Sequence, residues 1–559
     1  MRSVQDSAMS LQPEEDFNIP DETRRVALAA FPKGCACLHI SKVLGGIYQD
    51  KQFASLFPRR GQPAESPGRL AFITVLQFME GFSDRQTADA VRARIDWKYA
   101  LGLELTDPGF DHTVLSEFRT RLVVGKLELA LLDVLLEQVQ GLGLLKQRGK
   151  QRTDSTHVLA AIRTMNRLER VGETLRAALN ALAVAGPEWL RTVADPEWFK
   201  RYGSRVENFN LPKTEAARQQ LATIIGSDGK TLLRAIDASE ARIKFRKLAE
   251  VLLLERVWSE QFIDDDDGQP RLRKVEQMPP SAELVTSPYD PDARYSTKRG
   301  NPWVGYKVHL TESCDVDAPR LITNVETTPA TTPDDNMIEV IHRSLQCRNL
   351  LPAEHLVDKG YTDAKVLVVS RREHGVEIIG PVAQDPSWQS RDNAGFDKSA
   401  FTIDWDRKVV ICPERKQSVS WLPSTYPAKG TVFEARFARR DCTPCASRPR
   451  CTRAKREPRI IGLQTREYHE ALQTLRKRQT TDEFRKAYAA RSGIESTHAQ
   501  AIRCSGLRRT RYRGLAKTRL QHVVTAAAIN FLRIAAWANG TPVAQTRCSH
   551  FAALQFKTT

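Results

Sequence analysis

The sequence predicts a mixed α/β fold in which one central sheet is joined to separate helical regions. Strand-like runs at 303–313 ("WVGYKVHLTES") and 320–330 ("RLITNVETTPA") precede a helix-like segment, a strand-like "AEHLV", a second helix and "VEIIGPV". Two strands, a helix, a strand, a helix and a strand describe a mixed sheet. Stretches with helical periodicity lie on both sides of these runs. A chain of 559 residues, 41% of them hydrophobic, is long enough for about two to four structural units.

Shifts in composition and periodicity divide the chain further. A polar tail is expected at 1–22, a helical N-terminal domain at 23–145 and a C-terminal tail at 539–559. The sheet is expected to combine 146–164, 276–400 and 471–538. Two insertions interrupt it: a helical one at 165–275, and a small β-like one at 401–470 that contains four cysteines.

The N-terminal helical region supports two interpretations. Ser66 and Pro67 predict a helix start, and Gly81 predicts its end. In "FDHTVLSEFRTRL" a short helix is expected, with Arg119 and Arg121 facing outward. Short helices with basic outer faces are typical of helix-turn-helix DNA readers. A plain helical packing domain explains the same pattern equally well.

The charge balance favours an acidic partner. The chain has 84 Lys and Arg against 67 Asp and Glu, a net charge of +17, and nucleic acid is the commonest partner of such a protein. A merely soluble basic protein is the alternative. Neither a signal peptide nor a membrane span is expected, because the longest apolar runs reach only about ten residues. We therefore expect a cytoplasmic protein without a membrane partner, whose ten cysteines stay reduced unless metal binds them.

Three acidic residues stand where a metal site could form. Asp358 follows the strand-like run in "HLVDKGY", and Asp154 lies in the strand-like "RTDST". The carboxyl edge of an α/β sheet is the usual place for a ligand site. Glu495 belongs to the helical "YAARSGIESTHAQ", where Tyr488 and Arg491 fall on the same face. Three converging carboxylates are suited to hard divalent cations.

These residues carry a resemblance to a known family. The chain resembles the DDE-type transposases of bacterial insertion sequences, in particular those with a tyrosine-arginine-glutamate signature. "TDST" is similar to the segment of the family's first aspartate, "LVDKGY" to that of the second, and Tyr488, Arg491 and Glu495 to its third motif. "GYKVHL", "TTPATTPDD" and "GLRRTRYRGLAK" add to the likeness.

The resemblance implies a ribonuclease H-like catalytic core and a DNA transposase that binds terminal inverted repeats, cleaves DNA and transfers strands. It further implies two Mg²⁺ (or Mn²⁺) ions on Asp154, Asp358 and Glu495, a homodimer on DNA, and contacts from Arg491 and Tyr488 to a phosphate or an unpaired base. A ribonuclease H-like nuclease without strand transfer and a non-catalytic DNA-binding protein derived from a transposase are the alternatives. His309 and His498 are expected to be structural.

One position departs from the family pattern. The family has a lysine seven residues after the glutamate, where this chain has Ile502, and we consider the next residue, Arg503, as a replacement. From 503 to 519 the chain has seven basic residues and no acid, which is typical of phosphate contacts. The residues expected to contact DNA in this basic tract are Arg503, Arg508, Arg509, Arg511, Arg513 and Lys517.

Two further motifs concern cofactors. Cys412, Cys442, Cys445 and Cys451 have a spacing that suits a structural tetrahedral zinc, with buried or idle thiols as the alternative. "GSDGKTLL" ends like a phosphate-binding loop, but Ile224 stands where the leading glycine is required, so no nucleotide cofactor is expected.

Overall fold

The computed structural model describes residues 11, 17–58, 64–298, 300–393, 395–426, 430–542 and 551. Most of the tail expected at 1–22, and most of the one expected at 539–559, lies outside these residues. None of the helices formed by the described residues combines the length and the apolar character needed to cross a bilayer.

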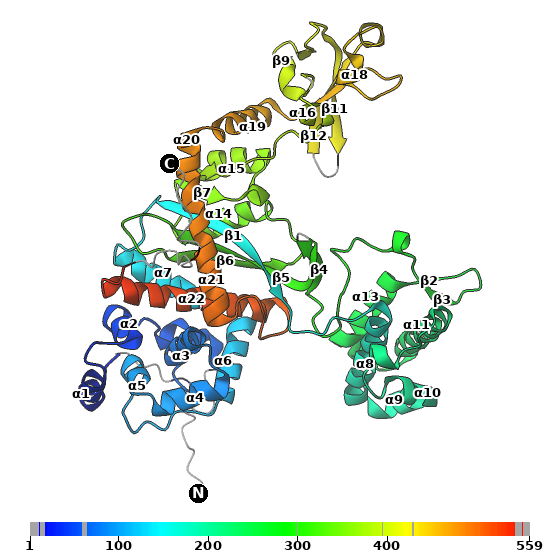
Figure 1. The fold of residues 1–559 in the computed structure, drawn as a ribbon. Helices are drawn as coiled ribbons and strands as arrows, with labels where there is room; N and C mark the ends of the chain where they lie inside the picture. The colour runs from blue at the N-terminus through cyan, green and yellow to red at the C-terminus, as the bar shows by residue number, and fades with distance from the viewer. Residues whose placement is uncertain are drawn as a thin grey trace.

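A six-stranded mixed sheet stands at the centre of the molecule, as the sequence predicted (Figure 1). β5 pairs antiparallel with β1 on one side and with β4 and β6 on the other, while β7 and then β8 continue the sheet in parallel from β1. The strands are β1 (Lys150–Leu159), β4 (Arg294–Lys298), β5 (Asn301–Ser313), β6 (Ile322–Pro329), β7 (Glu354–Val357) and β8 (Glu377–Ile379).

Helices cover both faces of this sheet. α14 (Met337–Cys347) packs on the face that carries Val357 and Ile378, and α15 (Ala364–His374) connects β7 to β8. The opposite face carries Leu356 and Ile379, which contact Leu475 and Phe484 of the C-terminal helices. The order of strands and helices from β5 to β8 is the one predicted. Strand alternation assigns three more side chains to this second face. Arg152 is paired with Leu356, and Asp154 and Asp358 each lie two residues further along their strands.

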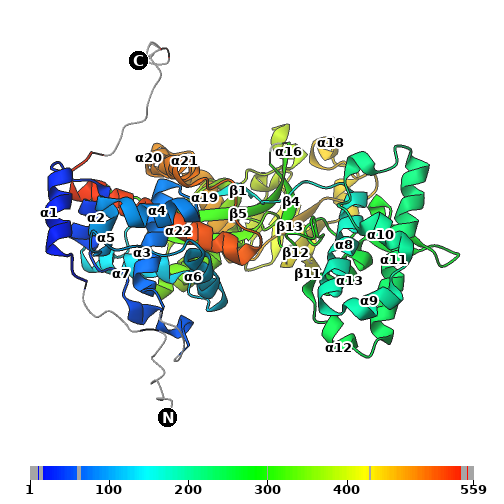
Figure 2. The same cartoon turned by 90° about the horizontal axis from the view of Figure 1, so that it is seen from below.

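The N-terminal helices share one hydrophobic core with the sheet. α22 (Leu515–Ala538) lies between them and contacts α2, α3 and α7 as well as β6 (Figure 2). Ser66 caps α3 by accepting a hydrogen bond from the Arg69 amide at 3.1 Å, and Gly81 ends it at φ 71°, as predicted. The elements are α1 (Asp21–Ala30), α2 (Ala36–Leu44), η1 (Asp50–Gln52), η2 (Ala54–Leu56), α3 (Pro67–Glu80), α4 (Asp84–Ala93), α5 (Ile95–Leu101), α6 (Thr113–Val124) and α7 (Ala130–Gly141).

One surface residue expected in this region is in fact buried. Arg119 of α6 is 6% exposed and donates to Asp84 at 2.6 Å and to Gln77 at 3.2 Å. The expectation that it faces outward was wrong, because its guanidinium joins α6 to α3 and α4. It is therefore part of the packing of these helices.

A second hydrophobic core holds together the helical region between β1 and β4 (Figure 1). The glycine-lysine-threonine sequence at 229–231 lies in the middle of a long helix there, so its backbone has no phosphate-binding loop. The elements are α8 (Arg167–Ala185), α9 (Pro187–Val193), α10 (Pro196–Tyr202), η3 (Asn208–Asn210), α11 (Glu215–Ala238), α12 (Arg242–Phe245), α13 (Ala249–Gln261), β2 (Phe262–Asp264), β3 (Pro270–Leu272) and η4 (Val275–Gln277).

The cysteine-containing region forms a small unit with its own apolar cluster, and it projects from the sheet beyond α19 (Figure 1). Its longest strands, β11 and β12, form an antiparallel hairpin to which β13 is added. The elements from 388 to 463 are α16 (Trp388–Arg391), η6 (Lys398–Ala400), β9 (Thr402–Asp404), β10 (Val409–Ile411), β11 (Ser418–Tyr426), β12 (Gly430–Phe437), α17 (Arg439–Cys442), α18 (Arg448–Cys451) and β13 (Ile460–Leu463).

The chain returns to the sheet through α19 (Arg466–Arg478) and α20 (Asp482–Ala489). The single helix predicted from Tyr488 through Glu495 is interrupted, because a 3₁₀ turn, η7 (Ala490–Ser492), separates α20 from α21 (Gly493–Ser505). Arg491 therefore lies in the turn, whereas Glu495 lies in the first turn of α21.

Four histidines outside the cleft described below are buried in the neutral form. Burial lowers the pKa of His309 to about 4, of His355 and His522 to about 3, and of His342 to about 2. His309 contacts the Tyr361 hydroxyl at 2.7 Å, and His342 contacts His355 at 2.9 Å. Each imidazole therefore stays neutral in the folded chain at pH values at which the unfolded chain takes up a proton.

We predict that the fold loses stability on mild acidification. The pKa values of these histidines in the folded chain lie below the unfolded value of about 6.5. The stability that their neutral forms contribute is therefore complete above pH 6.5 and is lost as the pH falls below it. Each histidine contributes a slope of at most about 1.4 kcal/mol per pH unit. The thermal unfolding midpoint should fall between pH 6.5 and 4.5, and His522→Asn should flatten the slope, whereas His112→Asn, at a half-exposed position, should not. A midpoint independent of pH in this window would contradict the prediction.

Candidate active site

Asp154 and Asp358 lie side by side on two parallel strands, Asp154 in the middle of β1 and Asp358 directly after the carboxyl end of β7. Thr153 of β1 is paired with Val357 of β7, and each aspartate is the next residue along its strand direction. One oxygen of each carboxylate is fixed locally: Asp154 Oδ1 accepts from the Ser155 amide, and Asp358 Oδ1 from the Gly360 amide, both at 2.8 Å. The other oxygen, Oδ2, is the one nearer to Arg491 of η7 in both cases.

The guanidinium of Arg491 stands between these aspartates and Glu495. Its Nη2 lies 2.7 Å from Asp154 Oδ2 and 3.9 Å from Asp358 Oδ2, and its Nη1 lies 3.2 Å from Glu495 Oε1. The structure thus brings together the three predicted carboxylates, and an arginine occupies the position between them. The Nε of Arg491 is buried and has no hydrogen-bond partner among the described residues.

The three carboxylates differ in exposure. The side chain of Asp154 is 15% exposed, that of Asp358 39% and that of Glu495 69%. Burial raises the pKa of Asp154, and the nearby charge of Asp358 raises it further, whereas the guanidinium of Arg491 acts in the opposite direction. Arg491 therefore offsets part of the cost of gathering like charges at this edge of the sheet.

A cleft of about 790 Å³ opens in front of these residues. Its lining combines the three acids with basic, aromatic, uncharged polar and aliphatic side chains. Ile502 and Arg508 line the cleft, but Arg503, the proposed replacement for the family lysine, does not. The other residues of the wall that bear on its chemistry are His157, Lys298, Trp303 and His498.

The basic tract reaches the cleft because it docks on β1. The Leu159 amide donates to the Arg508 carbonyl at 2.8 Å, and the Thr510 amide donates to the Leu159 carbonyl at 3.0 Å. This parallel bridge uses the end of β1 that β7 leaves unpaired. The side chains of Arg508 and Arg509 stay exposed, as do those of Arg503, Arg511, Arg513 and Lys517.

Two of the expected contact residues have a packing role. Tyr488 stacks on Phe484 with ring centroids 5.7 Å apart and does not line the cleft. Arg511 lies over the ring of Phe78 at 4.9 Å and donates to the Phe82 carbonyl. Of the two histidines considered, His309 is fully buried, whereas His498 lines the cleft with its pKa lowered to about 4 by burial.

Two segments of the chain match known protein families. Residues 411–535 match the family model of a transposase DDE domain, and residues 26–121 match that of a transposase domain, DUF772. The chain belongs to the DDE-type transposases of insertion sequences. No curated protein and no solved structure matches the chain.

The matched segments cover the transposase unevenly. The DDE match begins in the cysteine unit and continues through Arg491 and Glu495 to α22, whereas Asp154 and Asp358 lie outside both matches. The two aspartates are thus linked to the matched part of the transposase by the geometry around Arg491.

A fourth acid of the transposase lies close to the pair of aspartates. Asp334 Oδ1 accepts from Lys307 at 2.9 Å, and its Oδ2 accepts from the Ser155 hydroxyl at 3.2 Å. A Cβ on Gly360 would lie 3.1 Å from Asp358 and 3.3 Å from Asp334, so this glycine lies between the two carboxylates. Sequence reasoning quoted "TTPATTPDD" but did not assign Asp334 a role.

The four cysteines of the transposase surround one small cavity of about 30 Å³. Cys412 Sγ accepts a hydrogen bond from the Lys416 amide at 3.3 Å, and burial raises the pKa of Cys451 to about 11. In the described part of the chain, the group of three or more metal-binding side chains whose ligand atoms all lie within 4.8 Å of one another is Glu339, Glu373 and His374. The four cysteines are not in this group, so their sulfur atoms face a common space without all lying within 4.8 Å of one another.

Proposed function

We propose that the protein binds the terminal inverted repeats of an insertion sequence, cleaves the DNA at its ends and joins the freed ends to target DNA. The observation that carries this proposal is the convergence of Asp154, Asp358 and Glu495 on Arg491 in a chain with transposase domains. Asp154 and Glu495 are 341 positions apart in the sequence, so their proximity is a result of the fold.

The sheet supports a ribonuclease H-like core. Three antiparallel strands, β6, β5 and β1, are followed by two parallel ones, β7 and β8, and the first aspartate lies on the central strand β1. We propose that the sheet with α14, α15 and α19–α22 is the catalytic core, and that α8–α13 and the cysteine unit are insertions into it. The N-terminal helices, packed on α22, are proposed to read DNA.

The three carboxylates fit a pair of hard divalent cations. Each aspartate keeps one oxygen free of backbone hydrogen bonds, and Glu495 is largely exposed, so oxygen ligands converge from two strands and one helix. Asp154, Asp358 and Glu495 would hold Mg²⁺ or Mn²⁺ here. Such ions, when bound, favour an in-line displacement at a phosphate by activating the attacking oxygen and stabilising the leaving one.

Arg491 is proposed to exchange its partners during binding. In the structure described, its guanidinium supplies the positive charge that the carboxylates need. A phosphate of DNA offers the same fork-shaped group a bidentate partner. We propose that Arg491 turns from the acids to the phosphate next to the cut, and that Tyr488 supports the turn from which it projects by stacking on Phe484.

The basic wall of the cleft is proposed to hold the DNA backbone. Arg508 and Lys298 line the same cleft as the acids, so phosphates flanking the cut can contact them. On this assignment Arg508, carried to the site by its pairing with β1, supplies the cation that Ile502 lacks, and Arg503 does not. Joining requires two DNA ends at once, and we propose a homodimer on DNA for this reason.

A structural zinc is proposed for the cysteine unit. Four soft ligands surround one cavity. The hydrogen bond from the Lys416 amide to Cys412 Sγ is of the kind that stabilises a thiolate. The metal would cross-link β10 to α17 and α18 in a unit whose apolar cluster is small.

Asp358→Asn should abolish cleavage of labelled element ends in Mg²⁺ but leave their binding in a mobility-shift assay unchanged, because the amide retains the shape and loses the charge. Asp482→Asn, an exposed acid of α20 outside the cleft, is the control and should cleave normally. Cleavage by Asp358→Asn at the wild-type rate would remove Asp358 from the site.

The same assay with a target plasmid separates the proposed function from its alternatives. Joined products between labelled ends and plasmid are expected for a transposase. Cleavage without joined products would indicate a nuclease, and end binding without cleavage by the wild-type chain would indicate a non-catalytic DNA-binding protein.

Arg491→Gln should bind Mn²⁺ more tightly than the wild-type chain when no DNA is present, by about tenfold, because one competing positive charge is removed from between the acids. Titration calorimetry at pH 7.5 measures this difference. Arg485→Gln removes an arginine of α20 that pairs with Asp482 at 2.9 Å, away from the cleft, and should leave Mn²⁺ affinity unchanged. A Mn²⁺ affinity of Arg491→Gln equal to or weaker than that of the wild-type chain would contradict the proposal that Arg491 exchanges the acids for a phosphate.

Metal analysis of chain purified without chelators should find about one zinc per chain. Cys445→Ser and Cys451→Ser should each lose it, whereas Cys347→Ser, at an exposed thiol on α14, should retain it. A zinc content far below one ion per wild-type chain would show that the thiols hold no zinc.

A further inference from the structure

A closed network of buried charges lies behind the candidate site. Glu312 of β5 is fully buried, and both of its carboxylate oxygens are occupied. Oε1 accepts from Arg152 of β1 at 2.7 Å, and Oε2 accepts from the Thr497 hydroxyl of α21 at 2.6 Å and from Arg533 of α22 at 2.8 Å. One carboxylate therefore ties two strands to two helices.

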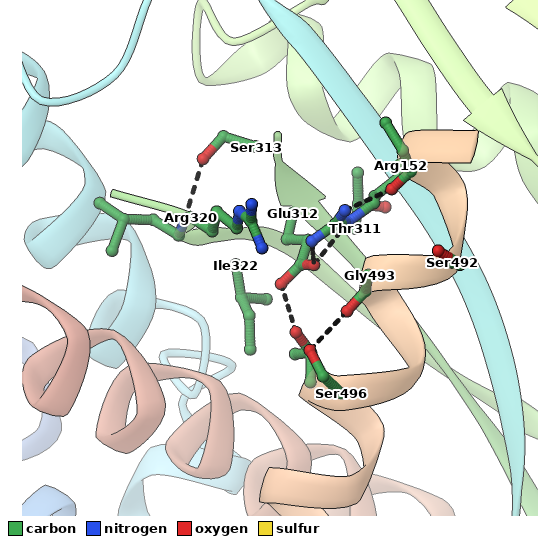
Figure 3. A network of polar contacts seen from close by, with 12 residues as sticks. Arg152, Thr311, Glu312, Ser313, Arg320, Ile322, Ser492, Gly493 and Ser496 are labelled. Carbon is green, nitrogen blue, oxygen red and sulfur yellow. Dashed lines mark hydrogen bonds and ion pairs between the residues drawn. The ribbon is translucent and has the colours of Figure 1, made fainter. Parts of the chain in front are cut away.

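The network contacts the candidate site on both sides. Arg152 stands two residues before Asp154 on the same face of β1, and Thr497 stands two residues after Glu495 on α21. Arg152 also donates to the carbonyl of Ala490, the first residue of the turn that carries Arg491. Figure 3 shows Glu312 and Arg152 beside the first turn of α21, which carries Gly493 and Ser496.

Gly493 makes room for this arrangement. A Cβ at Gly493 would lie 2.1 Å from Arg152 Nη1, which is closer than any real contact. The guanidinium thus packs directly against the backbone of the first helical residue of α21. The absence of a side chain there lets the helix approach β1 closely.

Stability alone does not account for a network of this kind. A buried ion pair costs desolvation, and well-packed apolar side chains of similar volume are often as stabilising or more so. What charged hydrogen bonds add is direction, since each fixes the distance and angle between two elements. Apolar packing would let α21 shift along the sheet by fractions of a turn.

We propose that Glu312 is a positioning residue that, through Arg152 and Thr497, sets the spacing between Asp154 on β1 and Glu495 on α21. This inference rests on the proposed function, because it assigns the spacing to a reaction at those carboxylates. A displacement of about 1 Å in such a site lowers turnover by up to about 100-fold.

Thr497→Val tests the proposal with little disturbance of the fold. It replaces the hydroxyl that joins α21 to Glu312, and that accepts from Arg533 Nη2 at 2.6 Å, by a methyl group of the same shape. Glu312 stays bonded to Arg152 and Arg533, and Arg533 Nη2 keeps Gln500 as an acceptor. The kcat for cleavage of element ends should fall about 10- to 100-fold, with KM for DNA unchanged. Mn²⁺ affinity, measured by calorimetry without DNA, should fall as well.

Two matched variants separate positioning from general damage. Thr497→Ser restores the hydroxyl and should restore both kcat and Mn²⁺ affinity. Ser496→Ala removes the neighbouring hydroxyl, which donates only to the Gly493 carbonyl in this structure, and should change neither. Gly493→Ala favours the helix by intrinsic propensity, yet should lower kcat because its Cβ displaces the Arg152 guanidinium.

The outcomes are distinct. If Thr497→Val and Gly493→Ala cleave DNA and bind Mn²⁺ like the wild-type chain, the positioning role of Glu312 is overturned and the proposed function stands. If Thr497→Ser is as impaired as Thr497→Val, the hydroxyl is not the cause and the positioning role is again overturned. A wild-type chain that neither binds Mn²⁺ nor cleaves overturns the proposed function, and the positioning role falls with it.

Discussion

The buried pair of Arg152 and Glu312 is the contact on which the arrangement of the site depends, because it joins residues 160 positions apart and fixes a helix onto the strands it covers. Backbone pairing alone sets Asp154 beside Asp358, since β1 and β7 are neighbours in the sheet. The segment after α21 pairs with Leu159 of β1, but among the described residues no backbone hydrogen bond joins α21 itself to the sheet. Its place on the sheet relies on side chains, and the directional ones come from the network around Glu312.

Local signals predicted the parts of the fold that local interactions determine. The apolar run and the turn after it placed Asp358 at the end of its strand, and Ser66 with Gly81 predicted the ends of α3. Asp154 was expected at a strand end in the same way but lies in the middle of β1, and it stands beside Asp358 because β7 pairs only with the first four residues of β1. The break at η7 was missed because the spacing of Tyr488, Arg491 and Glu495 fits one helical face, whereas the turn is held by a distant donor, Arg152. A pattern of residues within one segment cannot reveal such a partner.

Buried arginines were the other source of error, for the same physical reason. Arg119 was expected at the surface because charged side chains are rarely buried unless they are paired. Its partner Asp84 lies 35 positions away and gives no local sign. Likewise, the basic tract was predicted to contact DNA, but its route to the cleft depends on the pairing of Arg509 with the end of β1, a long-range contact that only the folded sheet provides.

The two arginine-carboxylate groups of the site have opposite character. Around Glu312 every carboxylate oxygen is used and water is excluded, so the group is closed and fixed in place. Around Arg491 the acids are partly exposed, one guanidinium nitrogen has no partner among the described residues, and three carboxylates share one guanidinium, which offsets only part of their negative charge. That charge repels a phosphate backbone. Any cation taken up by the carboxylates removes this repulsion, and by linkage a bound phosphate, in drawing Arg491 away, favours the uptake of cations. Binding of DNA and of divalent ions at this cleft should therefore reinforce each other.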